Sequence, residues 1–415
     1  MTQVSSDFAP PFKMIEPFFK YGSLLYILSL ISLLFIDSNS SIIDFKIVGF
    51  AHLFLLGFVM IIIFGAMAQL IPVVLEVGHF SVDLYYVIFP TLFIGTLLLV
   101  SGFWFESSLI PYGAMLVFIS MLVFLFETFA TLKKTTTNTL TVQAVRYGNI
   151  FLTIAIIVGF IMAIAIGNGL NIDVSRLLPI HVVLVIFGYV TITIVGLSMV
   201  LLPMFGLAHG YEDKDVELAF KLLVYSVIAF SVLRLIGLDF LSNLAFLTIA
   251  LAIIFYIKQL LTLYKIRARK LIDIWYKHIY VAFISLVVAT LLGLIGYFFN
   301  LDNFFKAAAW IYIIGFFAFV INGHLLKIIP FLVWFERFSP LVGKKRVPML
   351  HEMLNDKDSE FSFWFSLAGL VIGAIGLLLG SDDIFKGGVL LLVAGAFFMY
   401  KSVVYILNFK EEDYV

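Results

Sequence analysis

The sequence predicts an all-α integral membrane protein whose twelve transmembrane helices form three pseudo-symmetric units of four helices. Three observations predict this class. Of the 415 residues, 63% are apolar and only 13% are charged, which is more apolar surface than a soluble domain buries. The chain contains twelve apolar runs of about 20 residues, the length that crosses a bilayer as a helix. A pattern of glycine and proline also recurs three times along it.

The apolar runs are too long and too uniformly apolar for the strands of a barrel. Transmembrane helices are expected at residues 18–36, 47–74, 85–105, 111–132, 149–170, 177–202, 217–238, 240–265, 278–299, 304–329, 361–379 and 384–407. With the N-terminus inside, all but five of the 26 lysines and arginines fall on the inner side. Positive residues favour the cytoplasmic face. We therefore expect a multi-pass protein of the bacterial inner (cytoplasmic) membrane with both termini in the cytoplasm.

The second, sixth and tenth spans share one layout, in which an apolar helix runs to Pro72, Pro203 or Pro330. Two glycines precede each proline at matching places: Gly57 and Gly65, Gly188 and Gly196, Gly315 and Gly323. Each repeat therefore contains four spans. The single transmembrane domain, residues 1–415, is expected to consist of units at about residues 18–132, 147–265 and 278–407. Because proline lacks a backbone donor, we expect each one to help end its helix.

Two of the three repeat helices carry a histidine near their start. His52 lies five residues into the second span and His181 four into the sixth, so at ~1.5 Å per residue both imidazoles lie about 6–8 Å below the outer boundary. A polar ring in a span needs a partner. A haem iron is one such partner, and water or backbone at the interface is the alternative. The chain has no cysteine, which excludes covalent c-type haem and thiolate metal sites. His52 and His181 are thus the predicted metal ligands.

Other polar side chains lie at a similar level. Tyr189 follows the histidine of its span by two turns and could line the same cleft. Arg176 and Arg234 are placed to pair with haem propionates, and ion pairs with Asp173 and Asp239 are the alternative interpretation. These three side chains are predicted to bind the cofactor. Further polar residues expected at membrane depth are Gln69, Glu76, Glu127 and Asn168.

Five more histidines lie toward the inner side, and two of them, His278 and His351, are assigned no role. His324 stands beside Asn322 and Lys327 near the end of the tenth span, and it is a candidate for a second haem, a quinone pocket or propionate anchoring. Packing at the interface is the alternative for this residue. His79 and His209 follow their repeat prolines by seven and six residues, in inner loops. We expect both of these to be solvated, and leave open whether His324, His79 and His209 form a second site.

The segment His52-LFLL-Gly57-Phe58, followed by Gly65 and Pro72, resembles the histidine helix of subunit I of the haem–copper oxidase superfamily. It is closer still to the H-x-x-x-x-G-F pattern of NnrS-type haem- and copper-containing membrane proteins, and the opening PPFKMIEPFF is similar to the aromatic entry of that family. By topology the resemblance covers the whole chain, and by motif only the repeat helices. It implies an oxidase-type fold with one or two b-type haems, and electron transfer or the binding or sensing of a small gas such as nitric oxide.

The sequence departs from the oxidases at the copper site. A type-B copper centre needs three imidazoles, but Trp310 stands where the histidine of the tenth span would fall. The seventh span has no His-His pair, and no H-P-E-V-Y follows His181. We therefore expect no complete dinuclear site, and no copper held as a three-histidine centre.

The sequence thus predicts a b-type haem protein of the lipid bilayer, with a quinol or a small cytochrome as its redox partner and no nucleic acid bound. An oxidoreductase activity, five- or six-coordinate iron, and a homo-oligomer are left open. Two other function classes fit the same topology. One is a cofactor-free secondary transporter with twelve helices, although a threefold repeat is unusual among transporters. The other is a haem or copper handling protein.

Overall fold

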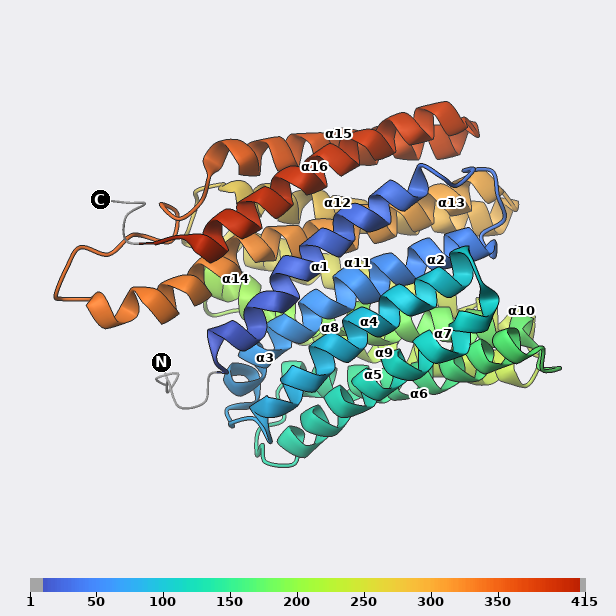
Figure 1. The fold of residues 1–415 in the computed structure, drawn as a ribbon, viewed down its shortest axis with the longest axis horizontal. Helices are drawn as coiled ribbons and strands as arrows, with labels where there is room; N and C mark the ends of the chain where they lie inside the picture. The colour runs from blue at the N-terminus through green and yellow to red at the C-terminus, as the bar shows by residue number, and fades with distance from the viewer. Residues whose placement is uncertain (1–9, 411–415) are drawn as a thin grey trace. The chain divides into compact units, whose positions relative to one another are not determined.

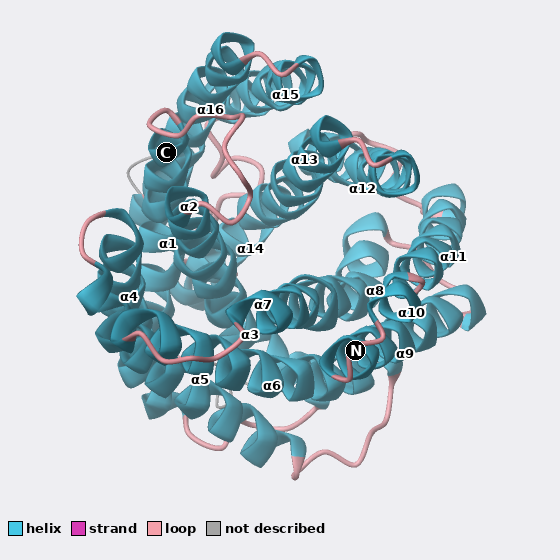
Figure 2. Cartoon of the chain, turned by 90° about the vertical axis from the view of Figure 1, so that its right-hand side faces the viewer, coloured by secondary structure: helices cyan, strands magenta, loops and turns pink. Residues whose placement is uncertain are grey.

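The computed structural model describes residues 10–410, and within that range every regular element is a helix (Figure 2). Twelve helical spans in this range are long and apolar enough to cross a membrane, which indicates a multi-pass membrane protein. The twelve spans occur in the predicted order, most of them a few residues longer than predicted. The largest difference in length is in the tenth span, which covers Asp302–Arg337.

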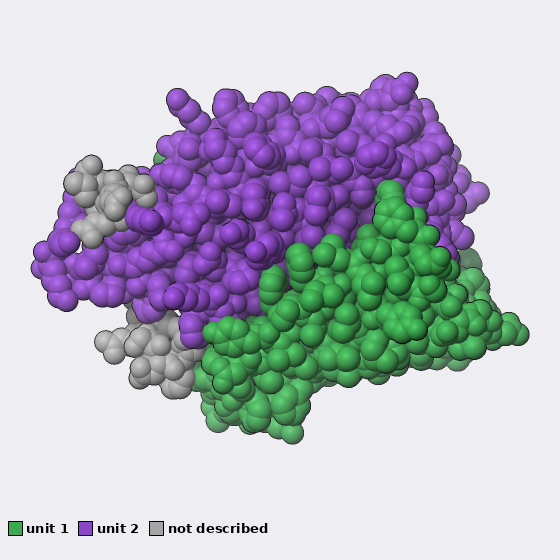
Figure 3. Space-filling model, viewed as in Figure 1, with its two compact units in different colours: residues 1–9, 69–271 green, residues 10–68, 272–415 purple. Residues whose placement is uncertain are grey.

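The chain divides into two compact units (Figure 3). Among the described residues, one unit comprises residues 69–271, and the other comprises residues 10–68 and 272–410. The helix α3 (Ile61–Leu75) crosses the boundary between them.

The unit of residues 69–271 contains η3 (Val82–Leu84), α4 (Tyr85–Trp104), η4 (Ser107–Leu109), α5 (Ile110–Leu132), α6 (Leu140–Asn168), α7 (Val174–Val183), η5 (Leu184–Thr191), α8 (Ile192–Gly206), α9 (Lys214–Leu235), α10 (Asp239–Asn243) and α11 (Ala245–Ile266). Helices α4 and α5 pack closely because Gly113 lies against the backbone of Leu99. Helix α5 also packs on α6, and α6 packs along α7, η5 and α8. Small residues at such contacts let helices approach where a larger side chain would separate them.

The other unit contains α1 (Phe12–Leu33), α2 (Phe45–Phe54), η2 (Leu55–Met60), α12 (Ile274–Phe299), α13 (Asp302–Trp310), η6 (Ile311–Ala318), α14 (Phe319–Arg337), η7 (Ser339–Leu341), α15 (Asp356–Leu379) and α16 (Asp382–Asn408). Helices α15 and α16 form a hairpin (Figure 1). Their glycines bring the two backbones together, as where Gly373 meets Gly388. Helix α1 packs on α2 and α16, and α12 packs on α13, η6 and α14.

Each of the three repeat helices contains a π-helical segment, which the sequence analysis did not predict. The segments are η2, η5 and η6, and each includes the first glycine of its repeat. Each ends twelve residues before its proline: Met60 before Pro72, Thr191 before Pro203, and Ala318 before Pro330. A π segment widens the helix locally and is found frequently at functional sites. The matched position shows that the three helices share a local backbone geometry as well as a residue pattern.

The paired glycines of each repeat helix also contact a neighbouring helix in one common register. The first glycine of each pair, fifteen residues before the proline, lies against Leu25 of α1, Phe151 of α6 or Ser285 of α12. The second, seven residues before the proline, lies against Phe18, Ala144 or His278 of the same helices. In all three cases the two neighbours are seven residues apart. The glycines therefore set the same packing between a repeat helix and the preceding long helix three times.

The prediction that each proline helps to end its helix is contradicted at Pro330, whereas Pro72 and Pro203 lie in the last turn of their helices. Pro72 and Pro203 lie three residues inside the ends of α3 and α8, and α14 continues from Pro330 to Arg337. Proline keeps a helical φ, so the helix continues if the carbonyl four residues earlier finds another donor. At Pro203 that carbonyl belongs to Met199, and the hydroxyl of Tyr211 donates to it at 3.3 Å.

Candidate functional site

His181 is held by two residues of the adjacent helix α6. Its Nδ1 lies 2.9 Å from the carbonyl oxygen of Ala155. Because that oxygen can only accept, Nδ1 carries a proton and donates it to the carbonyl. The ring lies over Gly159, where a Cβ would come within 2.7 Å of its Cε1. An imidazole fixed by an Nδ1–H bond to a backbone carbonyl is the usual arrangement of a metal-ligating histidine.

His52 has the same tautomer but a different support. Its Nδ1 lies 2.8 Å from the carbonyl oxygen of Val48 in its own helix, and the residue is half-buried. His52 precedes Pro72 by 20 residues whereas His181 precedes Pro203 by 22, and two residues turn an α-helix by roughly 200°. The two histidines therefore occupy different faces of their repeat helices. They belong to different compact units.

Tyr189 lies in the same unit as His181 and faces the same neighbouring helix. It sits on η5 with 1% of its surface exposed, and its ring lies 3.7 Å from the place of a Cβ on Gly148 of α6. Within residues 10–410 its hydroxyl has no hydrogen-bond partner. His181 and Tyr189 thus both face α6.

The structure brings Arg176 and Arg234 to one place in this unit. A Cβ on Gly237 would lie 3.4 Å from Nη1 of Arg176, and the backbone N–H of Gly237 donates to the carbonyl of Arg234. Each arginine also forms an ion pair with an aspartate. Nε of Arg176 lies 3.7 Å from Oδ2 of Asp173, and Nη1 of Arg234 lies 3.3 Å from Oδ1 of Asp239. Their side chains are 45% and 23% exposed. Both ion pairs that the sequence offered as the alternative interpretation are present.

Asp173 also begins the helix that carries His181. It is the N-cap of α7, where its carboxylate accepts from the backbone N–H of Arg176. The Ser175 hydroxyl donates to it at 2.6 Å. These hydrogen bonds, with the nearby guanidinium of Arg176, hold the pKa of Asp173 below its ordinary value. The carboxylate therefore stays charged at neutral pH and keeps the helix start in place.

His324 lies in the other unit, with its Nδ1 2.7 Å from the carbonyl oxygen of Val320. Its ring meets the ring of Trp275 edge-on, with centroids 5.9 Å apart. Its neighbour Lys327 is paired with Asp273 at 2.6 Å. This lysine therefore joins α14 to the start of α12.

His278 was given no role from the sequence, yet it is 1% exposed. Its Nδ1 lies 2.9 Å from the carbonyl oxygen of Ile274, and its ring packs between Phe319 and Phe363. Among residues 10–410 its Nε2 finds no hydrogen-bond partner. The contact of its Cβ with the repeat glycine Gly323 accounts for its place on α12. In the sequence, the signal for the position of His278 is its spacing of seven residues from Ser285, because these two residues of α12 meet the two repeat glycines.

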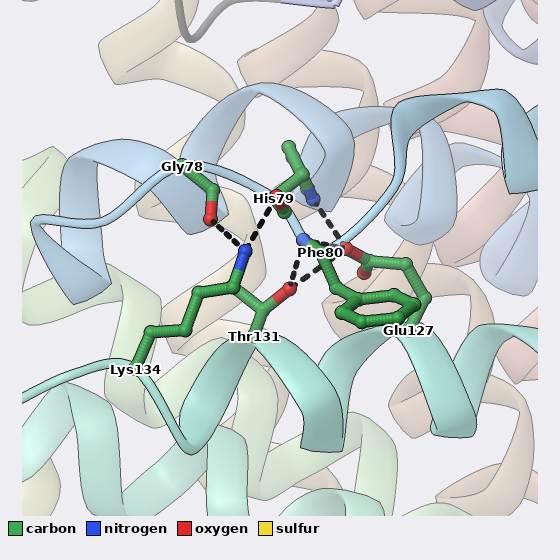
Figure 4. A network of polar contacts seen from close by, with 6 residues as sticks. All are labelled: Gly78, His79, Phe80, Glu127, Thr131 and Lys134. Atoms are coloured by element: carbon green, nitrogen blue, oxygen red, sulfur yellow. Dashed lines mark hydrogen bonds and ion pairs between the residues drawn. The ribbon is translucent and has the colours of Figure 1, made fainter.

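The expectation that His79 is solvated was wrong, whereas His209 is exposed as predicted. The side chain of His79 is 1% exposed, and its Nδ1 lies 2.8 Å from Oε1 of Glu127 on α5, a residue with no exposed surface (Figure 4). The reason is this buried carboxylate, which draws the loop between α3 and α4 onto α5. The 48 residues that separate the two in sequence concealed the contact.

The donors around Glu127 all meet one of its two oxygens. Oε1 accepts from His79, from the Thr131 hydroxyl at 2.8 Å and from the backbone N–H of Phe80 at 3.2 Å (Figure 4). Oε2 is buried and has no hydrogen-bond partner in the described chain. Lys134 supports the loop through the carbonyl of His79 at 2.9 Å. Among the described residues, the hydrogen bonds to Glu127 therefore reach Oε1 and not Oε2.

Within residues 10–410 no three or more histidine, cysteine or acidic side chains come together in a way that could hold a metal ion. No protein-family model matches the chain, and no curated protein matches it. The candidate site thus rests on the geometry of these residues.

Proposed function

We propose that the protein is a membrane-embedded b-type haem protein with the fold of haem–copper oxidase subunit I and without a complete copper site. It would act in electron transfer or in binding a small gas such as nitric oxide. The observation that carries the proposal is the way Ala155 and Gly159 hold His181, since they fix its tautomer and make room for its ring.

The repeated glycine contacts support the oxidase-type fold. Three repeat helices with π segments at one position, each in the same register on the preceding long helix, fit three equivalent units of four helices. The basic loops fit both termini in the cytoplasm of a bacterial inner membrane. A quinol or a small cytochrome would be the redox partner.

We infer that His52 and His181 each bind a separate haem. Their different positions before the repeat prolines put their rings on different helix faces, which does not favour one shared iron. For the haem on His181, Arg176 and Arg234 would hold the propionates in place of their aspartates, and Tyr189 would offer its hydroxyl to the ring or to a bound gas. A bound haem supplies one-electron redox chemistry at a potential set by its ligands and surroundings.

Haem quantification in the purified full-length protein tests this proposal. We expect two haems per chain, and a loss of half of the haem in His52→Ala and in His181→Ala taken separately. His209→Ala is the matched control, because that histidine is exposed, and it should keep all of its haem. Complete loss in either ligand variant would show a single iron held by both rings. A fully loaded, stable sample without haem would overturn the proposal and favour the secondary transporter or the haem or copper handling protein.

A further inference from the structure

We propose that the hairpin of α15 and α16 binds one sodium ion between its helices, through the carboxylate of Asp358 and the hydroxyls of Ser359, Ser362 and Ser402. The four side chains belong to the same compact unit and lie where α15 begins and α16 ends. This inference does not depend on haem, since none of these residues belongs to the proposed haem site.

The register of the hairpin brings two serines together. The helices meet through small residues at steps of seven along each chain segment, and the pairs in contact are Gly373 with Gly388 and then Ser366 with Gly395. The numbers fall along α15 as they rise along α16, so the helices are antiparallel. The next step of seven brings Ser359 of α15 to Ser402 of α16. Because the backbones approach closely, the space between these two serines suits a small ligand.

The hydroxyls at this position are buried and unsatisfied. Ser359 and Ser402 are at most 1% exposed, and in the described part of the chain neither Oγ has a hydrogen-bond partner. The same is true of Ser362, one turn further along α15. A buried hydroxyl is ordinarily bonded, as that of Ser29 on α1 is to a carbonyl of its own helix. Three neighbouring hydroxyl oxygens are therefore left for a ligand.

Asp358 adds a charged oxygen to this set. Its Oδ1 accepts from the ammonium of Lys401 on α16 at 3.0 Å, so the carboxylate is directed toward the partner helix. Its Oδ2 is buried and has no hydrogen-bond partner among residues 10–410. Ser362 follows Asp358 by four residues and Ser359 by three, so it adjoins both on the helix surface. Oδ2 and the three hydroxyls thus form a set of four oxygens.

The charges at the site suit a monovalent cation. Hard cations take oxygen ligands such as these. The neighbouring acids add no charge to the set, because Asp356 is exposed and Glu360 is paired with Lys277 of α12. One carboxylate balances one positive charge, whereas a divalent ion would leave an excess charge among buried groups. The close approach of the two backbones favours sodium over the larger potassium ion.

Lys401 gives the ion a way in. Its side chain is 56% exposed, whereas that of Asp358 is 6% exposed. The ammonium therefore reaches Oδ1 from the aqueous side and returns to water when a sodium ion takes its place, which leaves one positive charge beside the carboxylate. The N-terminal end of α15 lies beside the C-terminal end of α16, so the dipoles of the two helix ends oppose each other at the site. In the predicted topology this end of the hairpin faces the cytoplasm.

Binding of radioactive sodium ions to the purified full-length protein in detergent tests the site. We expect saturable binding of one ion per chain, displaced by unlabelled sodium chloride but not by potassium or choline chloride at the same ionic strength. Asp358→Asn should bind sodium at least about tenfold more weakly. Asp383→Asn is the matched control, because Asp383 is an exposed acid in the first turn of the other helix, and it should bind normally. Wild-type protein without saturable binding, or binding unchanged in Asp358→Asn, would overturn the proposal.

Two further variants keep the test decisive if Asp358→Asn does not fold. Ser402→Ala removes one ligand and should weaken sodium binding several-fold, whereas Ser29→Ala, which changes a buried serine that is already bonded, should not. Lys401→Gln removes the competing ammonium and should bind sodium several-fold more tightly, so its unfolding temperature should rise with sodium concentration. If Asp358 and Lys401 formed only a structural ion pair, Lys401→Gln would be equally destabilised in sodium and in choline chloride, and the proposal would be wrong.

Discussion

Gly159 and His181 occupy one shared space: a Cβ on the glycine would lie 2.7 Å from Cε1 and 3.2 Å from Nδ1 of the imidazole. The absence of a side chain on α6 is what lets the ring reach the carbonyl of Ala155 one turn away. Helix α6 therefore specifies both the position and the tautomer of a histidine on another helix. Such a pairing supports the ligand role that we propose for His181.

Gly159→Ala should displace the imidazole, because its methyl group would meet the ring at less than contact distance. We expect a destabilisation of about 1–3 kcal/mol from overpacking, and a several-fold loss of the haem that we propose His181 binds. Haem content and thermal unfolding in detergent measure the two effects. Gly387→Ala, where no atom lies within 4 Å of the new Cβ, is the control and should change neither. Full haem occupancy in Gly159→Ala would count against the role given to this glycine.

The spans were predictable from the sequence because membrane crossing depends on composition alone. A run such as the one around Gly196 has to be helical in lipid, whichever residues it meets. The contacts of that glycine were not predictable, since its partner Ala144 lies 52 residues earlier and nothing in the apolar pattern marks it. The three π segments, and the contact between His79 and Glu127, were not predictable for the same reason. They depend on tertiary packing, which hydropathy does not encode.

Gly196→Ala should destabilise the packing of α8 on α6, because its Cβ would clash with the Cβ of Ala144. We expect a loss of about 1–3 kcal/mol, measured by thermal unfolding in detergent. The double variant Ala144→Gly/Gly196→Ala places one methyl group in the same space from the other helix. It should recover most of the stability, which is the signature of direct coupling.

Gly293→Ala is the control for this pair, because the nearest atom to its new Cβ is 3.7 Å away, an ordinary contact. This variant should unfold at nearly the same temperature as the wild type. If the double variant were as unstable as the sum of its two single changes, Gly196 and Ala144 would not share a contact.

Deleting one residue from the π segment η5 should be tolerated better than deleting one from the regular helix that follows. A π segment contains an extra residue within an α-helix, so removing Val185 restores α-helical winding and preserves the register of both flanks. Removing Leu197 from α8 instead rotates everything after it by about 100°. We expect the Val185 deletion to give a monodisperse protein in detergent, and the Leu197 deletion to aggregate. Equal behaviour would show that η5 holds no extra residue.

Tyr211→Phe should remove the donor that satisfies the Met199 carbonyl left without its helical N–H by Pro203. We expect a loss of about 0.5–1.5 kcal/mol, the usual net contribution of one hydrogen bond. The pKa of Tyr211 is raised, first by burial and then by the charge of Asp213. For an acid with a raised pKa the protonated form is favoured in the folded state. The contribution of the phenol to the free energy of unfolding is therefore complete below the pKa of about 10 in the unfolded state. It is lost as the pH rises through the raised pKa of the folded state.

The stability difference between wild type and Tyr211→Phe should accordingly be constant from neutral pH to about 10 and shrink above it. Chemical unfolding in detergent across this range measures the difference. Tyr225→Phe is a matched control, because that phenol is 68% exposed on α9 and its loss should have no effect at neutral pH. A Tyr211→Phe difference that grew with rising pH would show that the phenolate, and not the phenol, stabilises this end of α8. The Met199 carbonyl would then need another donor for α8 to continue past Pro203.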